Sequence, residues 1–282
     1  MKKLLALFAI PFVLTACGSD DEASQYKTSV ELSSVSKGVA QLQITITDED
    51  GNPASGDVKI TPIMNMTSGM IHSTPLSTST GELDTDGQFA TTAYFLMPSG
   101  AMGSWSVEVS FNNTTTSHAI DVDMMMSDVK QLKGGEDDQI AHMDTEVART
   151  YYLFDLGRMV SNNMNAFSVF VAARESLMNY QPITDGAVLN AATDYELSIG
   201  TVVVEMCSQS CENESNWQTA MEDSEQAGVY QAMNLNLNND ENDVVEVRLS
   251  IGGSTKTSDG TLEGNNASFT FSSESSMPMA MM

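Results

Sequence analysis

Basic residues and cysteines are scarce in this chain of 282 residues, and each scarcity excludes a class of protein. Lysine and arginine together number 12, against 38 aspartates and glutamates, which gives a formal net charge of −26. Such a chain lacks the basic patch that binds nucleic-acid phosphates, so we expect no nucleic-acid partner. The same balance argues against docking on anionic lipid through protein charge. Three cysteines are too few for a disulfide-rich scaffold.

Catalytic motifs and long apolar runs are missing as well. The sequence contains no G-x-S-x-G, P-loop, H-E-x-x-H or G-x-G-x-x-G pattern, so we predict that the protein is not an enzyme. No segment after residue 16 is long and apolar enough to predict a transmembrane helix. Charged residues make up 18% and apolar residues 41% of the chain, which is typical of a globular protein rather than a disordered polyanion.

The N-terminus carries a targeting pattern. Two lysines precede an apolar stretch over residues 4–13, which is too short for a permanent membrane-spanning helix. The following Leu14-Thr15-Ala16-Cys17 resembles a bacterial lipobox, which implies cleavage after residue 16 and acylation of the cysteine. In that pattern Gly18, rather than aspartate, favours sorting to the outer membrane over the inner one. An ordinary secretory signal with an incidental cysteine is the alternative.

We therefore expect a lipoprotein of the bacterial cell envelope, with residues 17–27 as a tether. Its contact with the membrane would be the acyl chains on Cys17, which gain about 0.8 kcal/mol per buried CH₂. Another envelope protein is a further candidate partner. Removing residues 1–16 deletes two lysines, so the mature balance is 10 minus 38, or −28 before the termini are counted.

Apolar and polar residues alternate along short segments of the first half, and the pattern predicts strands with turns between them. The expected strands are residues 28–35, 39–47, 58–66, 88–97, 105–111 and 118–123. Asp50-Gly51 and Asp86-Gly87 mark two of the turns, and no convincing helix is present. This spacing is typical of an immunoglobulin-like β-sandwich, which we assign to residues 28–126.

The second half repeats the plan, so the predicted fold is all-β, with two tandem immunoglobulin-like sandwiches. The expected strands are residues 151–156, 166–173, 195–206, 228–237, 244–251 and 261–272, within a domain over 147–272. Residues 127–146, which include Gly134-Gly135, are interpreted as a linker, and 273–282 as a methionine-rich tail. A gapless offset of 141 places Met66 on Cys207 and Met70 on Cys211, which suggests a divergent repeat.

Methionine is abundant, at 20 residues, and three methionines fall beside a histidine within nine residues: Met64, Met66, Met70 and His72. Thioether and imidazole suit Cu(I), whereas Ca²⁺ and Mg²⁺ require oxygen ligands. Met97 and Met102 flank a turn that could approach as auxiliary ligands. Methionine also fills irregular cores, and Met64 and Met66 continue the buried parity of their strand. A metal site and a purely structural methionine loop are therefore both open.

A family resemblance supports the interpretation of these residues as a metal site. Residues 44–111 resemble the YtkA-like or FixH-like family of small immunoglobulin-like envelope modules. The matching pieces are the Asp50-Gly51 turn, the Met/His stretch over 62–75, Gly87-Gln88-Phe89, and Phe95-Leu96-Met97 leading to Gly103-Ser104-Trp105. The resemblance implies cation or copper handling in the envelope, with Met64, Met66, Met70 and His72 as ligands and Met97 as a further one. Some relatives carry several histidines here, so the single histidine favours Cu(I) over Cu(II).

Cys207 and Cys211 stand four residues apart, and an oxidising compartment favours a disulfide between them over a thiolate metal site. The leading functional hypothesis is an envelope lipoprotein that binds or delivers a soft metal ion, most simply Cu(I). The alternative is a non-catalytic structural or interaction lipoprotein, including an adhesion-type surface module, whose methionines serve in packing.

Overall fold

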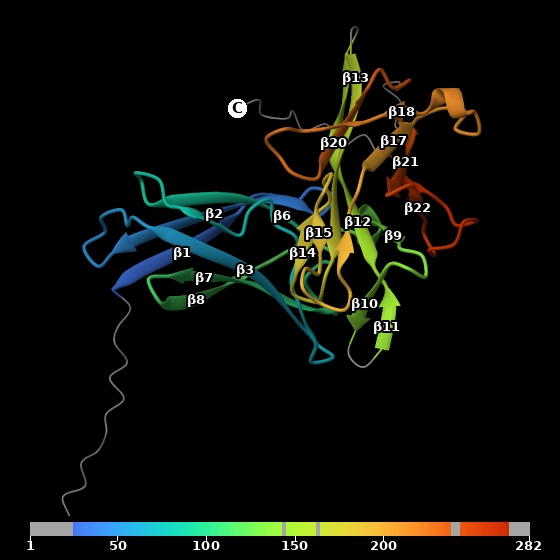
Figure 1. The fold of residues 1–282 in the computed structure, drawn as a ribbon. Coiled ribbons are helices and arrows are strands. Elements are labelled where there is room, and N and C mark those ends of the chain that lie inside the picture. The colour runs from blue at the N-terminus through green and yellow to red at the C-terminus, as the bar shows by residue number, and fades with distance from the viewer. Residues whose placement is uncertain (1–24, 143–144, 162–163, 238–242, 271–282) are drawn as a thin grey trace, which may run out of the picture.

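The computed structural model describes residues 25–142, 145–161, 164–237 and 243–270. Its regular elements are strands, apart from two 3₁₀ turns, η1 (Met126–Asp128) and η2 (Glu214–Asn216). The all-β prediction is confirmed. Figure 1 shows two β units side by side, with β1 to β8 in one and most of the later strands in the other. The predicted signal peptide, Cys17 and the methionine-rich tail over 273–282 lie outside the described residues.

Two antiparallel sheets form the first sandwich. One has the order β1-β2-β6 and the other β4-β3-β7-β8, with β5 also paired to β3. The strands are β1 (Tyr26–Leu32), β2 (Val39–Asp48), β3 (Asp57–Met66), β4 (Ile71–His72), β5 (Thr80–Glu82), β6 (Gln88–Tyr94), β7 (Gly103–Phe111) and β8 (Thr114–Ile120). Alternate residues of β2, β3 and β7 meet in one buried core, as the period-2 pattern predicts. Because β1 begins at Tyr26, the expected tether ends earlier than residue 27.

The predicted turns are present, and side chains hold them. The Asp84 carboxylate accepts hydrogen bonds from the backbone N–H groups of Asp86 and Gln88, at 2.9 and 2.8 Å. Gly87 has a φ of +72°, and a Cβ there would lie 2.5 Å from the carbonyl oxygen of Ile46. A side chain at this position would therefore collide with the neighbouring strand, so the turn requires glycine.

The second sandwich is built in the same way. One sheet has the order β19-β20-β13-β12-β9, with β14 paired to β13, and the other β18-β17-β21-β22, with β23 paired to β21. The first sheet contains β9 (Lys130–Lys133), β12 (Thr150–Ser161), β13 (Met164–Arg174), β14 (Tyr180–Pro182), β19 (Met221–Glu222) and β20 (Val229–Met233). The second contains β17 (Val202–Cys207), β18 (Gln218–Thr219), β21 (Val244–Ile251), β22 (Ser254–Lys256) and β23 (Ala267–Thr270). Two small pairs are β10 (Gln139–His142) with β11 (Thr145–Ala148), and β15 (Val188–Leu189) with β16 (Leu197–Ser198).

The linker prediction for residues 127–146 is wrong. This segment contributes β9 to the large sheet, where Leu132 is 1% exposed in the core. It also supplies Asp138, whose buried carboxylate binds Arg149 Nε and Lys256 Nζ, each at 2.8 Å. The Gly134-Gly135 pair and the acidic run suggested a solvated connection. However, a short strand and one buried carboxylate are enough to place the segment inside the domain.

The two sandwiches share an order of strands, but the gapless alignment between them is wrong. β1-β2-β6 corresponds to β12-β13-β20, and β4-β3-β7-β8 to β18-β17-β21-β22. The offset of 141 suits β6 and β20, where it places buried Phe89 on buried Tyr230, but it exchanges the two faces between β3 and β17, whose inward residues are all even-numbered. It would place fully buried Met64 on half-buried Glu205, whereas the inward residues of β17 are Val202, Val204 and Met206.

Besides the core of each sandwich, a third apolar cluster joins the two sandwiches, and we call it the seam. It contains Tyr94 and Leu96 from the first sandwich with Tyr152, Phe154, Phe170 and Val229 from the second, among others. The rings of Tyr94 and Phe170 stack with centroids 3.8 Å apart. An ion pair between Lys37 and Asp155 also crosses the seam. In the part of the chain that the structure describes, we find no helix whose length and hydropathy would let it span a bilayer.

Candidate metal site

The β3–β4 hairpin carries four of the six predicted ligands. Met64 pairs with His72 across the two strands, and Asn65 pairs with Ile71. One position nearer the turn, the backbone N–H of Met66 donates to the carbonyl oxygen of Met70 at 2.9 Å. Gly69 adopts a φ of +85°, which closes the turn. Met66 and Met70 therefore stand opposite one another at the tip of the hairpin.

All four side chains share one face of the hairpin, which we call the Met/His face. Residues two apart on a strand point the same way, and directly paired residues point to the same side. Asn65 and Ile71 occupy the opposite face, where Ile71 is 48% exposed. Cβ atoms of directly opposed residues lie about 4.5–5.5 Å apart. The spacing is short enough for flexible thioethers from both strands to reach a common point.

Burial differs along this face. Met64 is 0% exposed and packs in the core of the first sandwich, beside Trp105 on β7. Met66 is partly buried against the same core, whereas Met70 is partly exposed and outside it. The packing alternative therefore describes Met64 well. Met66, Met70 and His72 form the part of the face that solvent can reach.

His72 lies where the hairpin meets the second sandwich. Burial lowers the pKa of its imidazole below the ordinary value, and the positive charges of Arg174 and His142 lower it further. The adjacent Ser73 N–H donates to the carbonyl oxygen of Leu177 at 2.9 Å, which attaches the hairpin to this partner surface. The imidazole is therefore neutral at neutral pH, the form in which it can bind a metal ion.

His142 and Arg174 are neighbours of His72 that the sequence does not predict. They stand at the ends of β10 and β13, about 70 and 100 positions from His72 along the chain. Since only the packing of one sandwich against the other brings them close, no local pattern could reveal the contact. Both residues lie far outside the Met/His stretch over residues 62–75.

The two auxiliary methionines are placed differently. Met97 is partly buried against the first core, and its carbonyl oxygen accepts a hydrogen bond from Trp105 Nε1 at 2.9 Å. Met102 is 43% exposed, and its carbonyl oxygen accepts from the Thr67 N–H at 3.0 Å. The Met102 loop therefore runs along the turn between Met66 and Met70, whereas Met97 serves mainly in packing.

The described ranges hold few side chains that could form a different kind of metal site. Among these residues, no three histidine, cysteine, aspartate or glutamate side chains come close enough to share an ion. Cys207 and Cys211 form a disulfide with Cα atoms 5.7 Å apart, as predicted, so neither sulfur is available as a thiolate. Any ion at the Met/His face would thus depend on thioethers and one or two imidazoles.

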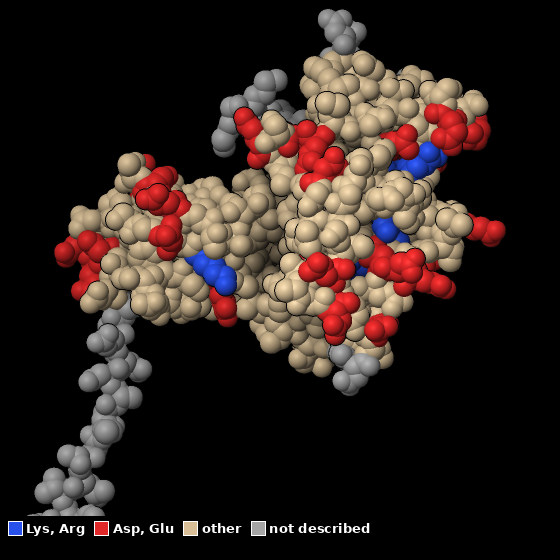
Figure 2. Space-filling model, in the orientation of Figure 1, with Lys and Arg blue, Asp and Glu red and all other residues tan. Residues whose placement is uncertain are grey.

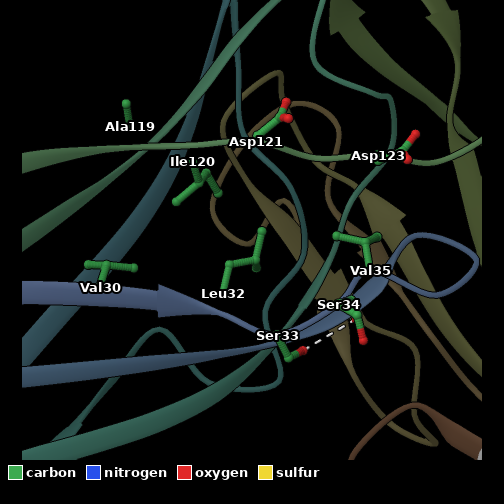
Figure 3. Close-up of a pocket in the computed structure, with 9 residues that line it drawn as sticks. All are labelled: Val30, Leu32, Ser33, Ser34, Val35, Ala119, Ile120, Asp121 and Asp123. Carbon is green, nitrogen blue, oxygen red and sulfur yellow. Dashed lines mark hydrogen bonds between the residues drawn. The ribbon is translucent and has the colours of Figure 1, made fainter.

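Most charged side chains on the face drawn in Figure 2 are acidic. Figure 2 shows them in several groups, with few basic side chains between them. A groove of about 540 Å³ also opens between the edge strands β1 and β8 (Figure 3). Val30, Leu32 and Ile120 give it apolar walls, and Asp121 and Asp123 stand at one side. No histidine, lysine or cysteine lines this groove, so its serines have no base to activate them.

Comparisons with known proteins do not assign this chain to a family. No family model matches the chain, and no curated protein matches it either. The crystal structure of the outer membrane decaheme cytochrome OmcA is 8% identical, with a TM-score of 0.22 over 90% of this chain and 70% of that one. A crystal structure of titin domains is 10% identical, with a TM-score of 0.21 over 82% of this chain and 94% of that one. Likenesses this distant carry no information about activity, and the resemblance to YtkA-like or FixH-like modules stays a prediction.

Proposed function

We propose that this protein binds a soft monovalent metal ion, Cu(I), at the tip of the β3–β4 hairpin. Met66, Met70 and His72 supply the ligands, and Met102 can approach from the adjoining loop. The observation that carries the proposal is the register of the hairpin, which places both accessible thioethers and the imidazole on one face. Thioether sulfur prefers Cu(I) over harder ions, and imidazole accepts it as well.

The neighbouring guanidinium supports a monovalent ion over a divalent one. Arg174 is close enough to His72 to lower its pKa by charge repulsion, and it would repel a bound cation too. Coulomb energy scales with the charge of the ion, so Cu(II) or Zn²⁺ would meet twice the repulsion that Cu(I) meets. The ligands are neutral and offset none of it. Met64 and Met97 then pack beneath the ion without binding it.

The proposed cellular location of the protein rests on the sequence alone. The lipobox-like Leu14-Thr15-Ala16-Cys17 implies acyl chains on Cys17 and a place on the outer membrane, facing an oxidising compartment. The disulfide suits such a compartment. In this setting the protein would hold Cu(I) or pass it to another envelope protein.

An anaerobic Cu(I) titration against a chromophoric chelator tests the proposal. The site variant is Met66→Leu/Met70→Leu/His72→Ala, and the matched control is Met125→Leu/Met126→Leu, which removes two methionines that are 67% and 49% exposed elsewhere. Even residues that only orient metal ligands change affinity by about 10–100-fold. Loss of the ligands themselves should therefore weaken one binding event by more than about 100-fold, and the control should bind as the wild type does.

The alternative is a structural or interaction lipoprotein, and one observation favours it. Met64 lies in the core, and Met66 packs against that core, as gap-filling methionines do. Equal Cu(I) uptake by the wild type and the site variant would support this alternative and contradict the metal proposal.

A further inference from the structure

A small polar groove lies beside the disulfide of the second sandwich, and we call it the amide groove. Its volume is about 210 Å³, and it is formed by the disulfide loop, the η2–β18 segment and the residues after β20. Eight of its nine lining residues are serine, asparagine or glutamine, and the ninth is Leu235. The groove belongs to the second sandwich and does not depend on the proposed metal site.

The lining carries no formal charge, in a chain that contains 38 aspartates and glutamates. Amides and hydroxyls both donate and accept hydrogen bonds, whereas carboxylates only accept and ammonium groups only donate. Such a lining offers nothing to neutralise an ionic ligand. It can instead satisfy a neutral ligand that alternates donors and acceptors at close spacing.

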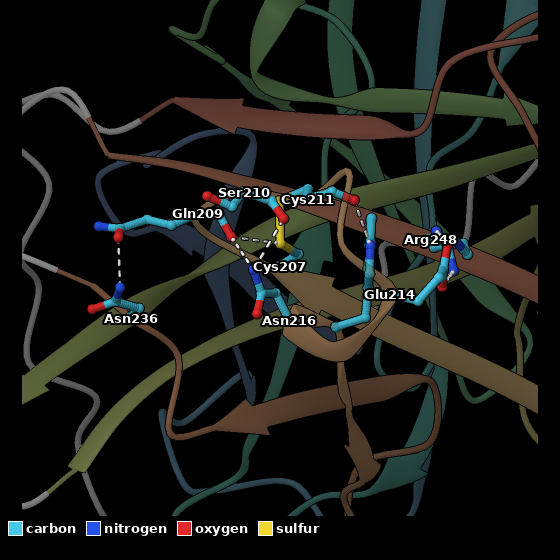
Figure 4. Close-up of a disulfide and its surroundings, with 9 residues drawn as sticks. Cys207, Gln209, Ser210, Cys211, Glu214, Asn216, Asn236 and Arg248 are labelled. Carbon is cyan, nitrogen blue, oxygen red and sulfur yellow. Dashed lines mark hydrogen bonds and ion pairs between the residues drawn. A yellow bond between two sulfur atoms is a disulfide. The ribbon is translucent and has the colours of Figure 1, made fainter.

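The backbone of the groove is held in place before any ligand arrives (Figure 4). The Cys207–Cys211 disulfide closes the loop that carries Gln209. Asn216 Nδ2 donates to the carbonyl oxygen of Ser210 at 3.0 Å, which ties η2 to that loop. Trp217 Nε1 donates to the carbonyl oxygen of Cys211 at 2.9 Å. A fixed backbone lowers the entropy that binding would otherwise cost.

Several polar groups of the groove still lack protein partners. In the described ranges, no hydrogen bond is made by the side-chain hydroxyls of Ser208, Ser210 and Ser215. Asn236 Nδ2 donates to Gln209 Oε1, which leaves Asn236 Oδ1 as an acceptor and Gln209 Nε2 as a donor. These groups can serve a ligand without breaking the bonds that hold the loop.

The groove offers no aromatic stacking surface. Trp217 lies between the lining residues Asn216 and Gln218 in sequence, but Arg248 covers its ring, with the guanidinium carbon 4.1 Å from the ring centre. Glu214 fixes that guanidinium through two hydrogen bonds of 3.0 and 3.2 Å. A ligand in the groove would depend on hydrogen bonds alone, so its affinity should be weak.

We propose that the amide groove binds a neutral carbohydrate, as one sugar unit of a glycan. Neighbouring sugar hydroxyls both donate and accept, which matches amides and serine hydroxyls. The volume is smaller than the 300–1,000 Å³ that encloses drug-sized ligands, so it suits a single ring. Because one sugar ring has few atoms and gains no aromatic stacking here, the expected dissociation constant is about 1 mM.

Saturation-transfer NMR on the full chain tests this proposal, with the methyl glycosides of glucose, galactose, mannose and N-acetylglucosamine as probes. The site variant is Gln209→Leu/Asn236→Leu, which changes two exposed side chains. The matched control is Gln43→Leu/Gln88→Leu, which removes another bonded amide pair, 3.1 Å apart, from the first sandwich. We expect saturable binding of at least one glycoside, at least tenfold weaker in the site variant and unchanged in the control. Binding of none of the four, or equal binding by the site variant, would overturn the proposal.

Discussion

Methionines on the Met/His face differ in what surrounds them, although their side chains are identical. Met64 is enclosed by the core of the first sandwich, while Met70, across the hairpin and nearer its tip, is partly exposed. A buried thioether contributes by filling space, whereas an accessible one can exchange solvent for a ligand. The position along the strand therefore decides the role of each methionine.

Truncating these methionines should separate the two roles. We expect Met64→Ala to lower the free energy of unfolding by about 2–5 kcal/mol, because it leaves a cavity in a closed core. Met70→Ala should change it by no more than about 0.5 kcal/mol. Urea denaturation of the metal-free protein measures both, and equal losses would show that Met70 is a core residue.

The lowered pKa of His72 predicts a dependence of stability on pH. The unfolded chain binds a proton at the ordinary histidine pKa of about 6.5, and the folded chain binds it only at lower pH. The stabilising contribution is therefore complete above about pH 6.5 and is lost as the pH falls from there toward the lowered pKa. Wild type should lose more stability between pH 7.5 and 5 than His72→Gln, which differs from it only in lacking this imidazole. Equal losses in urea denaturation would contradict the assignment.

Element by element, the sequence predicts the longer strands well and their partners poorly. Alternation locates β2, β3 and β7 because each buries only one face. The expected single strand over 195–206 is instead β16 and β17, separated around Gly200. The pairing of β3 with β4 depends on a two-residue strand, which is too short to give a periodic pattern. The Met/His residues were therefore predictable as a set, whereas their common face was not.

The disulfide should contribute modestly to the stability of β17 and the loop that follows. Cys207 and Cys211 are separated by four positions, so the closed loop is very short. Loop-closure entropy for such a loop corresponds to about 2 kcal/mol, and we expect Cys207→Ala/Cys211→Ala to lose about that amount. Thermal denaturation of the oxidised wild type and the variant measures it. An unchanged midpoint would show that the loop is held by its hydrogen bonds alone.

At the scale of the whole molecule, the seam makes the two sandwiches one packed body. β13 is buried along almost its whole length, because one face packs in its own sandwich and the other contributes Phe170 to the seam. The sequence carries a related signal on β6 and just after it. Four consecutive residues there are apolar, and the structure buries all of them: Ala93, Tyr94, Phe95 and Leu96. Such a run breaks the period-2 pattern and indicates contact on both faces. The partner surface could not be predicted, since it is more than 50 residues away in sequence.

Substitution of Tyr94 tests most directly whether the seam couples the two sandwiches. Tyr94 is almost fully buried, stacks on Phe170, and lies 5.4 Å from the ring centre of Phe154. Tyr94→Ala should cost about 3–5 kcal/mol and split thermal unfolding into two transitions, because it removes the ring that couples the sandwiches. Tyr94→Phe keeps the ring and should retain a single transition in calorimetry. One shared transition in Tyr94→Ala would mean that other contacts couple the sandwiches.

The position of a bound soft ion tests the central claim most directly. Silver(I) has the charge and softness of Cu(I), and anomalous diffraction from a crystal of the silver-loaded protein would locate it. The account predicts a silver peak within bonding distance of the sulfur atoms of Met66 and Met70 and a ring nitrogen of His72. Silver found only at other methionines, or at none, would contradict it.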